Sequence, residues 1–253
     1  MEQVVQTDFL HTLKFSEVAM TSEKLIKSKE RVQKHGEVFT PSWMVQKMLD
    51  TEGVKEATED IHATFLEPSS GDGNFLVAIL ERKLEAVTQQ FDKMNWKTKS
   101  LFALASIYGI EFLEDNLELA RFKMLDNYMK WYEKAFGERL SVNTGFYKST
   151  KFIIHKNIIR GNTLTKRHPD TDEPIIFSEW KRVKGKPSKV EWSEFTFASL
   201  FGENVNVERG IPEGQLSLFD LDGDGIDDIA LDIEKKMEPI IIDIQKVYQL
   251  EEK

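Results

Sequence analysis

Short apolar runs alternate along the chain with longer segments whose apolar residues recur at helical spacing. The short runs predict strands at 63–67, 107–112 and 152–159. The helical spacing predicts helices from 74 to about 94 and from 116 to about 136. Strands that alternate with helices in this way are typical of a parallel sheet. The sequence therefore predicts an α/β fold.

The N-terminal residues are polar, and their scattered apolar positions predict short helical pieces that end in the basic stretch 24–34. Pro41 suits the first turn of a helix. We expect this helix to run to about Glu52, with Thr40 or Ser42 as its cap.

The pattern changes after residue 165. The apolar run 175–177 predicts a fourth strand, and alternation of aromatic and polar residues predicts another strand at 191–201. A Gly/Asp-rich acidic stretch, typical of a linker, follows. Residues 238–251 predict a short helix with Pro239 in its first turn.

These patterns divide the chain into four segments. They are a helical N-terminal segment, a main domain, an acidic linker and a C-terminal helix, at 1–35, 36–201, 202–232 and 233–253.

Bulk composition excludes several classes of protein. A chain of 253 residues with 40% hydrophobic and 30% charged residues is long enough for a sizeable core. The longest apolar runs, such as 240–242, are too short to span a membrane, and the N-terminus does not resemble a signal peptide. We therefore expect a cytoplasmic protein that does not act at a membrane.

The residues that bind metals are scarce or scattered. The absence of cysteine excludes disulfides and thiolate metal sites, and the five histidines show no ligand spacing, so we expect no metal site. A net charge of −9 argues against broad contact with DNA phosphates, although a local basic patch is compatible with it.

The clearest candidate site is a glycine turn between the first strand and the next helix, within Phe-Leu-Glu-Pro-Ser-Ser-Gly-Asp-Gly-Asn-Phe-Leu at 65–76. Gly71 and Gly73 lack a Cβ and permit close approach of a ligand to the backbone. The N–H groups of the helix that starts near Asn74 face the same place. Glu111, in Tyr-Gly-Ile-Glu-Phe, ends the next strand, where a carboxylate suits the hydroxyls of a ribose. The alternative for the glycines alone is tight strand–helix packing.

A third motif, Gly-Glu-Val-Phe-Thr-Pro at 36–41, precedes the other two. In this order the three motifs resemble the S-adenosylmethionine-binding half of bacterial DNA adenine-N6 methyltransferases, the modification subunits of restriction systems. The resemblance covers residues 30–165. It implies a Rossmann-like class I methyltransferase fold, S-adenosylmethionine as cofactor and DNA as a partner.

The resemblance also implies roles for particular residues. Glu67 faces the amino group of the methionine moiety, Glu111 holds the ribose, and Phe112 or Ile110 packs on the adenine. Asn162 stands where the family usually has Asp to accept from the adenine amino group. For Phe39, Thr40 and Pro41 the alternative is simply a helix N-terminus. The implied cofactor residues are Phe39, Thr40, Pro41, Glu67, Gly71, Gly73, Phe75, Glu111, Phe112 and Asn162.

The family's catalytic Asn/Asp-Pro-Pro-Tyr/Phe is absent, since none of the seven prolines adjoins another. Its nearest equivalent is the segment 174–180, where Trp180 suits stacking on a flipped base and Ser178 or Glu179 suits accepting a hydrogen bond. The alternative, which we favour, is a strand that has lost catalysis. Enzymatic activity is therefore open, and sequence specificity requires a partner such as a restriction–modification subunit.

The acidic linker contains Gln215, Leu216, Ser217, Leu218 and Phe219, which resemble the pentapeptide that docks on bacterial sliding clamps. This favours a second hypothesis, a non-enzymatic interaction protein that acts in replication or repair. The alternative is a segment that packs on the protein's own surface.

Two charged stretches remain. The acidic residues 220–228 resemble the start of a calcium loop, but Leu231 replaces the bidentate carboxylate, so we favour a solvated linker. The basic run 181–189 suits contact with phosphates, and its alternative is a solvated loop.

Overall fold

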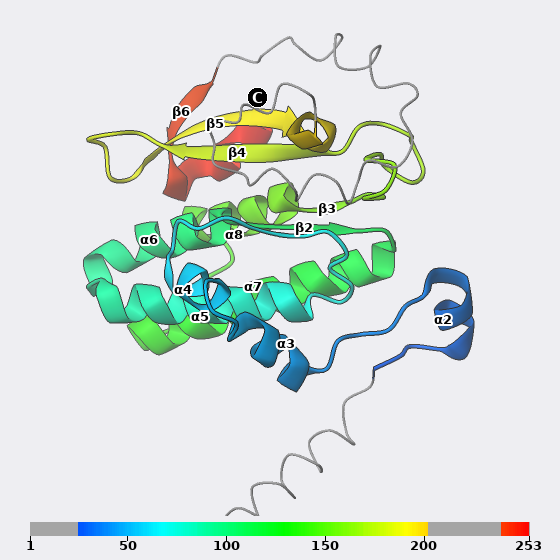
Figure 1. Cartoon of the computed structure of the whole chain (residues 1–253). Coiled ribbons are helices and arrows are strands. Elements are labelled where there is room, and N and C mark those ends of the chain that lie inside the picture. Colours follow the sequence, from blue (N-terminus) through cyan, green and yellow to red (C-terminus); the bar gives the residue numbers. More distant parts are fainter. Residues whose placement is uncertain (1–24, 202–238, 253) are drawn as a thin grey trace, which may run out of the picture. The chain divides into compact units, whose positions relative to one another are not determined.

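The computed structural model describes residues 25–201 and 239–252 (Figure 1). The chain divides into two units, Met1–Lys55 and Glu56–Lys253. The division falls inside the short helix α4, Val54–Glu59.

The first unit contains helices α2, Lys29–His35, and α3, Ser42–Leu49. Helix α2 confirms a helical piece in the N-terminal segment. The predicted cap of α3 is wrong, because Pro41 occupies the N-cap position and no side chain caps the helix. Helix α3 also ends at Leu49, before the predicted end at Glu52.

The second unit contains a parallel sheet of three strands in the order β1-β2-β3. The strands are β1, Phe65–Glu67, β2, Ile107–Glu111, and β3, Ile158–Arg160. Two helices connect each pair: α5, Asn74–Gln90, with α6, Lys93–Ala105, and then α7, Glu114–Phe136, with α8, Gly145–Asn157. The predicted α/β class with a parallel sheet is confirmed.

A second sheet of three strands is antiparallel, in the order β4-β5-β6. Its strands are β4, Ile176–Arg182, β5, Lys189–Thr196, and β6, Ile240–Asp243. Short 3-10 helices follow at Phe197–Phe201 and Ile244–Glu252. The predicted fourth strand thus exists as β4, but it pairs with β5 instead of extending the parallel sheet.

The two faces of β2 explain how the layers stack. On one face, a Cβ added to Gly109 would lie 3.0 Å from Leu76 Cδ1 of α5. On the other face, Tyr108 packs edge-on against Phe177 of β4, with ring centroids 5.3 Å apart. Ile110 shares that buried cluster. The parallel sheet therefore lies between helices and the antiparallel sheet (Figure 1).

Several predicted boundaries are wrong. The apolar run at 152–159 is mostly helix α8, which starts after the cap Thr144 and leaves only 158–160 as strand. Residues within α8 bury one helical face, and a short apolar run cannot by itself distinguish a buried helix from a strand.

The helix predicted from residue 74 to 94 ends at Gln90, and Asp92 caps the separate helix α6 by accepting from Asn95 N–H at 2.9 Å. The strand predicted at 191–201 is β5 followed by a 3-10 helix. The helix predicted at 238–251 is only partly present, since residues 244–252 form a 3-10 helix and residues 240–243 form β6. Pairing of β6 with β5 overrides the local preference of these residues.

Candidate functional site

The carboxyl ends of β1 and β2 lie next to each other, and each strand ends in a glutamate. The register pairs Glu67 with Gly109 and Glu111 with Arg160, so the strands end at one edge of the sheet. Parallel sheets bind ligands at this edge, where loops and helix N-termini converge. The turns after β1 and β2 are therefore the candidate site.

Glu111 is held firmly at this edge, and the residue is only 6% exposed. Its Oε2 accepts a hydrogen bond from Gly71 N at 2.7 Å, and its Oε1 accepts from Leu113 N at 2.9 Å. Asn116 Nδ2 donates a longer bond of 3.4 Å to Oε1. Bonds from N–H groups to a carboxylate are charge-assisted and stronger than neutral ones. The carboxylate thus joins the glycine turn to the start of α7.

The glycine turn adopts the backbone conformation that its sequence requires. Gly71 and Gly73 have φ angles of 54° and 91°, in the left-handed region. A Cβ at Gly73 would lie 2.9 Å from the Cα and the Cβ of Ala120 in α7. Gly73 is therefore needed for packing, which was the alternative interpretation. The same turn also places the uncapped N-terminus of α5 at the carboxyl edge.

Ser70, inside this turn, is a candidate that the sequence analysis did not single out. The residue is 6% exposed, and its N–H donates to Ile110 O at 2.9 Å. Its buried hydroxyl has no hydrogen-bond partner among the described residues. A buried hydroxyl that lacks a partner costs about 1–3 kcal/mol. A polar ligand atom at the turn would remove that cost.

Glu67 is the second carboxylate of the edge. Burial raises the pKa of its carboxyl, and a hydrogen bond from Ser69 N–H at 3.2 Å offsets this only in part. A cation placed beside Glu67 would lower that pKa and stabilise the charged form.

Two further side chains, Lys123 and Thr163, hold the turn. Lys123 Nζ, on α7, lies 2.6 Å from Asp72 Oδ2 and 3.2 Å from Asn74 Oδ1. The Thr163 hydroxyl, after β3, donates to Pro68 O. The sequence analysis missed these residues because their partners are 51 and 95 positions away.

Asn162 lies just beyond the end of β3, at the predicted edge. Its Oδ1 accepts from Leu164 N at 3.0 Å and from Thr165 N at 3.4 Å. The carbonyl oxygen therefore stabilises its own turn, and the contact with adenine stays a prediction.

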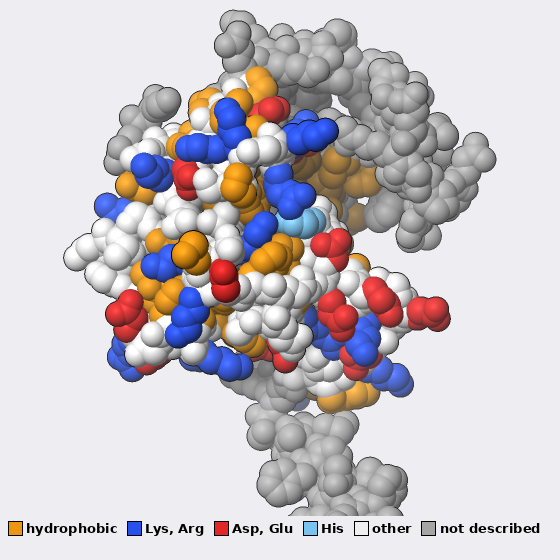
Figure 2. Space-filling view, turned by 90° about the vertical axis from the view of Figure 1, so that its left-hand side faces the viewer, with side chains coloured by type: hydrophobic (Ala, Val, Ile, Leu, Met, Phe, Trp, Pro, Cys, Tyr) orange, Lys and Arg blue, Asp and Glu red, His pale blue; other side chains and the backbone are white. Residues whose placement is uncertain are grey.

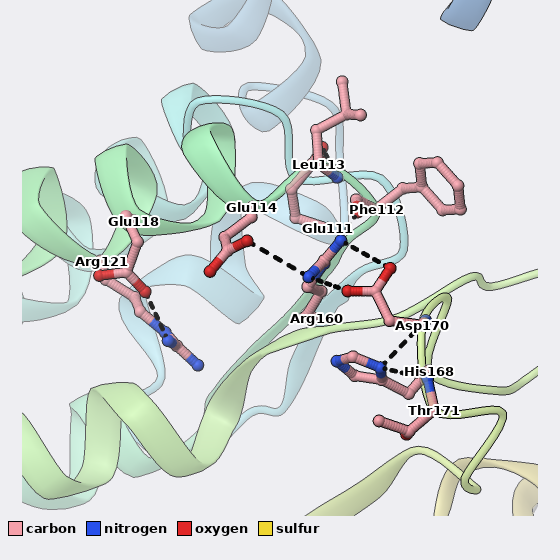
Figure 3. A network of polar contacts seen from close by, with 10 residues as sticks. All are labelled: Glu111, Phe112, Leu113, Glu114, Glu118, Arg121, Arg160, His168, Asp170 and Thr171. Carbon is pink, nitrogen blue, oxygen red and sulfur yellow. Dashed lines mark hydrogen bonds and ion pairs between the residues drawn. The ribbon is translucent and has the colours of Figure 1, made fainter.

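Arg160 organises the loop after β3 (Figure 3). Its Nη1 and Nη2 lie 2.6 Å and 3.2 Å from the two carboxylate oxygens of Asp170, and Nη1 lies 3.4 Å from Glu114 Oε2. Its Nε donates to Phe112 O at 3.4 Å. The Phe112 ring points away from this network and is 41% exposed. Arg160 thus fixes the backbone that presents an exposed aromatic ring at the edge.

Ser178, Glu179 and Trp180, the candidate catalytic residues, belong to β4. The Ser178 hydroxyl accepts from Trp192 Nε1 at 2.9 Å, and its carbonyl accepts from the Tyr108 hydroxyl at 2.9 Å. Burial raises the pKa of Tyr108 far above its usual range, so this phenol remains a donor.

The other two candidates lie farther along β4. Glu179 accepts from the Ser193 hydroxyl at 3.2 Å and pairs with Lys181 at 2.9 Å. Trp180 Nε1 donates to Oδ1 of Asn157 at 2.8 Å. Because Asn157 directly precedes β3, Trp180 lies toward the amino ends of the parallel strands. The described contacts of these residues are structural, and their role in catalysis stays a prediction.

Phe39, Thr40 and Pro41 lie in the first unit. Phe39 is buried, and its N–H donates to Leu25 O at 2.8 Å. Pro41 precedes α3, as the alternative interpretation expected. Their contact with a cofactor stays a prediction.

Two sequence motifs lie outside the described residues: the pentapeptide 215–219 and the acidic stretch 220–228. Within residues 25–201 and 239–252, no group of histidine and acidic side chains is placed to hold a metal ion. None of the helices described there is long and apolar enough to cross a membrane.

Comparisons with models of protein families, with curated proteins and with solved structures find no match for this chain.

Proposed function

We propose that the carboxyl edge of the parallel sheet binds S-adenosylmethionine. The observation that carries the proposal is the junction at which Glu111 accepts from Gly71 N–H, next to the Ser70 hydroxyl, which has no hydrogen-bond partner among the described residues. A carboxylate, a buried hydroxyl and a helix N-terminus meet there, and a nucleoside with hydroxyl groups matches them.

Each part of the ligand has a counterpart at the edge. The resemblance makes Glu111 the acceptor for the ribose hydroxyls, beside the Gly71 and Leu113 N–H groups from which it already accepts. The ammonium group of the methionine moiety pairs with Glu67, whose raised pKa reflects a partly buried carboxyl. The exposed ring of Phe112 offers a surface for the adenine.

We further propose that the chain is a relative of DNA adenine-N6 methyltransferases with a Rossmann-like class I domain. The order of the three motifs and the parallel sheet support this assignment. The missing Pro-Pro pair, and the position of Trp180 toward the opposite edge from Glu111, favour catalysis that is lost or that depends on a partner subunit.

Calorimetry with S-adenosylmethionine, and with its demethylated product, tests the binding proposal. We expect one site per chain with micromolar affinity, the range in which each tenfold change corresponds to about 1.4 kcal/mol. If neither ligand produces heat or a thermal shift, the site is excluded.

A labelled methyl group tests catalysis separately. We expect the protein alone to transfer little or no label to duplex DNA. Clear transfer to adenine that Glu179→Gln abolishes, with cofactor affinity unchanged, would identify a catalytic role for that residue.

The pentapeptide supports a second candidate function, docking on a bacterial sliding clamp. Leu218 and Phe219 match the apolar anchors of that motif, and Gln215 matches its amide. This function does not require the cofactor site, so each can be tested alone.

A further inference from the structure

The β4–β5 hairpin presents basic side chains on an ordered tip. Val183 N–H donates to Lys189 O at 3.2 Å, and Lys186 N–H donates to Val183 O at 3.1 Å. Gly185 supplies the positive φ of 75° that this turn requires. Lys184 and Lys186, on either side of Gly185, are exposed. Their charges therefore stand on a defined turn.

Arg182, at the end of β4, extends this positive charge toward the parallel sheet. Its Nη1 contacts Nε2 of His62, which precedes β1. A guanidinium only donates hydrogen bonds, so His62 Nε2 accepts and the ring is neutral. The ring also packs edge-on against Phe102, with centroids 6.5 Å apart.

The pKa of His62 is lowered, and nearby cations contribute to this after burial. Partial burial lowers it most, the Arg182 guanidinium lowers it next, and Lys99 and Lys83 lower it further. Asp60 acts in the opposite direction. Cations from the hairpin, from α6 and from α5 thus act on one histidine.

Some basic side chains in this region have a nearby carboxylate, and others do not. Lys181 pairs with Glu179 at 2.9 Å, and Lys189 lies 3.7 Å from Asp243. In the described part of the chain, no carboxylate lies within ion-pair distance of the remaining cations. These are Arg182, Lys184, Lys186 and Lys99. Figure 2 views the side on which the hairpin turn lies and shows Lys and Arg side chains gathered over its upper part.

We propose that Arg182, Lys184, Lys186 and Lys99 form a surface that binds the phosphate backbone of a nucleic-acid duplex. His62 borders this surface, which lies at the amino ends of the parallel strands, away from Glu111. It is therefore a docking surface separate from the cofactor site, and it does not depend on that site.

The composition of the surface determines the kind of partner. Lysines that act as point charges bind phosphates without reading bases, so binding is independent of sequence. No large apolar side chain is exposed on the described hairpin residues 181–189, which disfavours insertion into a lipid surface. An extended polyanion with regularly spaced charges suits the exposed Arg182, Lys184 and Lys186 of the hairpin, with the half-buried Lys99 as a fourth cation.

A simpler explanation is that charges protect the open edge of β4 from pairing with another strand. That explanation covers Lys181 and Arg182, which belong to the edge strand. It does not cover Lys184 and Lys186, which lie in the turn, or Lys99, which lies on α6.

The test measures binding of the full chain to two labelled duplexes of unrelated sequence, in DNA and RNA form, by fluorescence anisotropy over a range of salt concentrations. Four phosphate contacts predict a slope of log affinity against log salt of about −3 to −4 for DNA. Lys184→Ala with Lys186→Ala should reduce the steepness of this slope by about two for both sequences. The matched control, Lys130→Ala with Lys134→Ala on α7, removes the same charge and should leave affinity and slope unchanged.

The outcomes separate the proposals. Any one of three results would overturn the proposed surface. They are no salt-dependent binding at tens of micromolar protein, an equal loss of duplex affinity in the α7 control, and equal binding to vesicles of anionic lipid. Calorimetry with S-adenosylmethionine on the hairpin variant should match the wild type. A failure of duplex binding with normal cofactor binding, or the reverse, therefore identifies which proposal is wrong.

Binding should also depend on pH. A bound phosphate offsets the charges of Arg182, Lys99 and Lys83 and raises the pKa of His62, so the complex takes up a proton and affinity increases as pH falls. His62→Gln keeps an acceptor for Arg182 and should remove the pH dependence while it preserves the salt slope. An unchanged pH dependence would exclude His62 from the surface.

Discussion

The Glu111 carboxylate accepts a 2.7 Å hydrogen bond from the Gly71 N–H, a residue 40 positions earlier in the chain. The bond joins the end of β2 to the turn that follows β1. The conformation of the glycine turn and the position of the candidate ribose acceptor are therefore coupled, and a change at either residue should affect both stability and ligand binding.

Replacement of Glu111 by alanine should lower the melting temperature and weaken S-adenosylmethionine binding at least tenfold. The Gly71 and Leu113 N–H groups lose a buried acceptor, which costs about 1–3 kcal/mol. Thermal melts and calorimetry measure the two effects. Glu118→Ala, which removes an exposed carboxylate from α7, is the control and should change neither. If the Glu111→Ala variant melts at the same temperature as the wild type, the carboxylate does not hold the turn.

Ser70→Ala should affect stability and binding in opposite directions. It removes a buried hydroxyl that has no partner among the described residues, so the free protein should be as stable as the wild type or more stable. It also removes a group that the ligand satisfies, so affinity should fall. Ser149→Ala removes another buried serine hydroxyl without a hydrogen-bond partner in the described part of the chain, away from the carboxyl edge, and should leave affinity unchanged. Equal affinities of all three proteins would exclude Ser70 from the site.

Ligand affinity should increase as pH rises through the pKa of Glu67. Burial raises that pKa in the free protein, and a ligand ammonium binds the carboxylate form, so binding releases a proton as the carboxyl ionises. The effect should appear at acidic pH, below the α-amino pKa of about 8, where the ligand remains a cation. Calorimetry in buffers of different ionisation enthalpy measures the proton release. Glu67→Gln should bind more weakly and lose this part of the pH dependence; if it retains it, another group is responsible.

Gly73→Ala should destabilise the protein more than Gly137→Ala does. Both residues have positive φ, 91° and 76°, so both substitutions introduce backbone strain of about 1 kcal/mol. Only the alanine at position 73 would also collide with Ala120, whereas nothing lies within 4 Å of a Cβ at position 137. The overlap should add about 1–3 kcal/mol. Chemical denaturation measures both costs, and equal values would mean that α7 shifts to accommodate the methyl group.

The full chain should bind a bacterial sliding clamp with micromolar affinity, as expected for a short peptide that becomes ordered on binding. Leu218→Ala with Phe219→Ala should abolish binding, because buried apolar anchors supply most of the energy of a small interface. Cofactor affinity should be unchanged. If the wild type does not co-elute with clamp at tens of micromolar, or the double variant binds equally well, the pentapeptide is a coincidence.

The helices illustrate which predictions local pattern supports. The apolar positions of α5 at helical spacing, including Leu76, Leu80 and Leu84, are buried as predicted. The run that contains Phe152 and Ile153 was misassigned as strand. These residues are buried in α8, and apolar residues alone do not reveal which neighbours bury them.

By itself, the sequence determined the features that depend on neighbouring residues. They are the alternation of strands and helices, the glycine turn, and the glutamates that end β1 and β2. Each follows from local backbone preferences or from the periodicity of one element.

Only the tertiary structure decided which distant elements pair. It placed β4 in a separate antiparallel sheet, joined Arg182 to His62 across 120 positions, and bound Arg160 to the backbone of Phe112 across 48. The physical reason is that a hydrogen bond or an ion pair depends on the partner that packing brings close, and no local pattern in the chain specifies that partner.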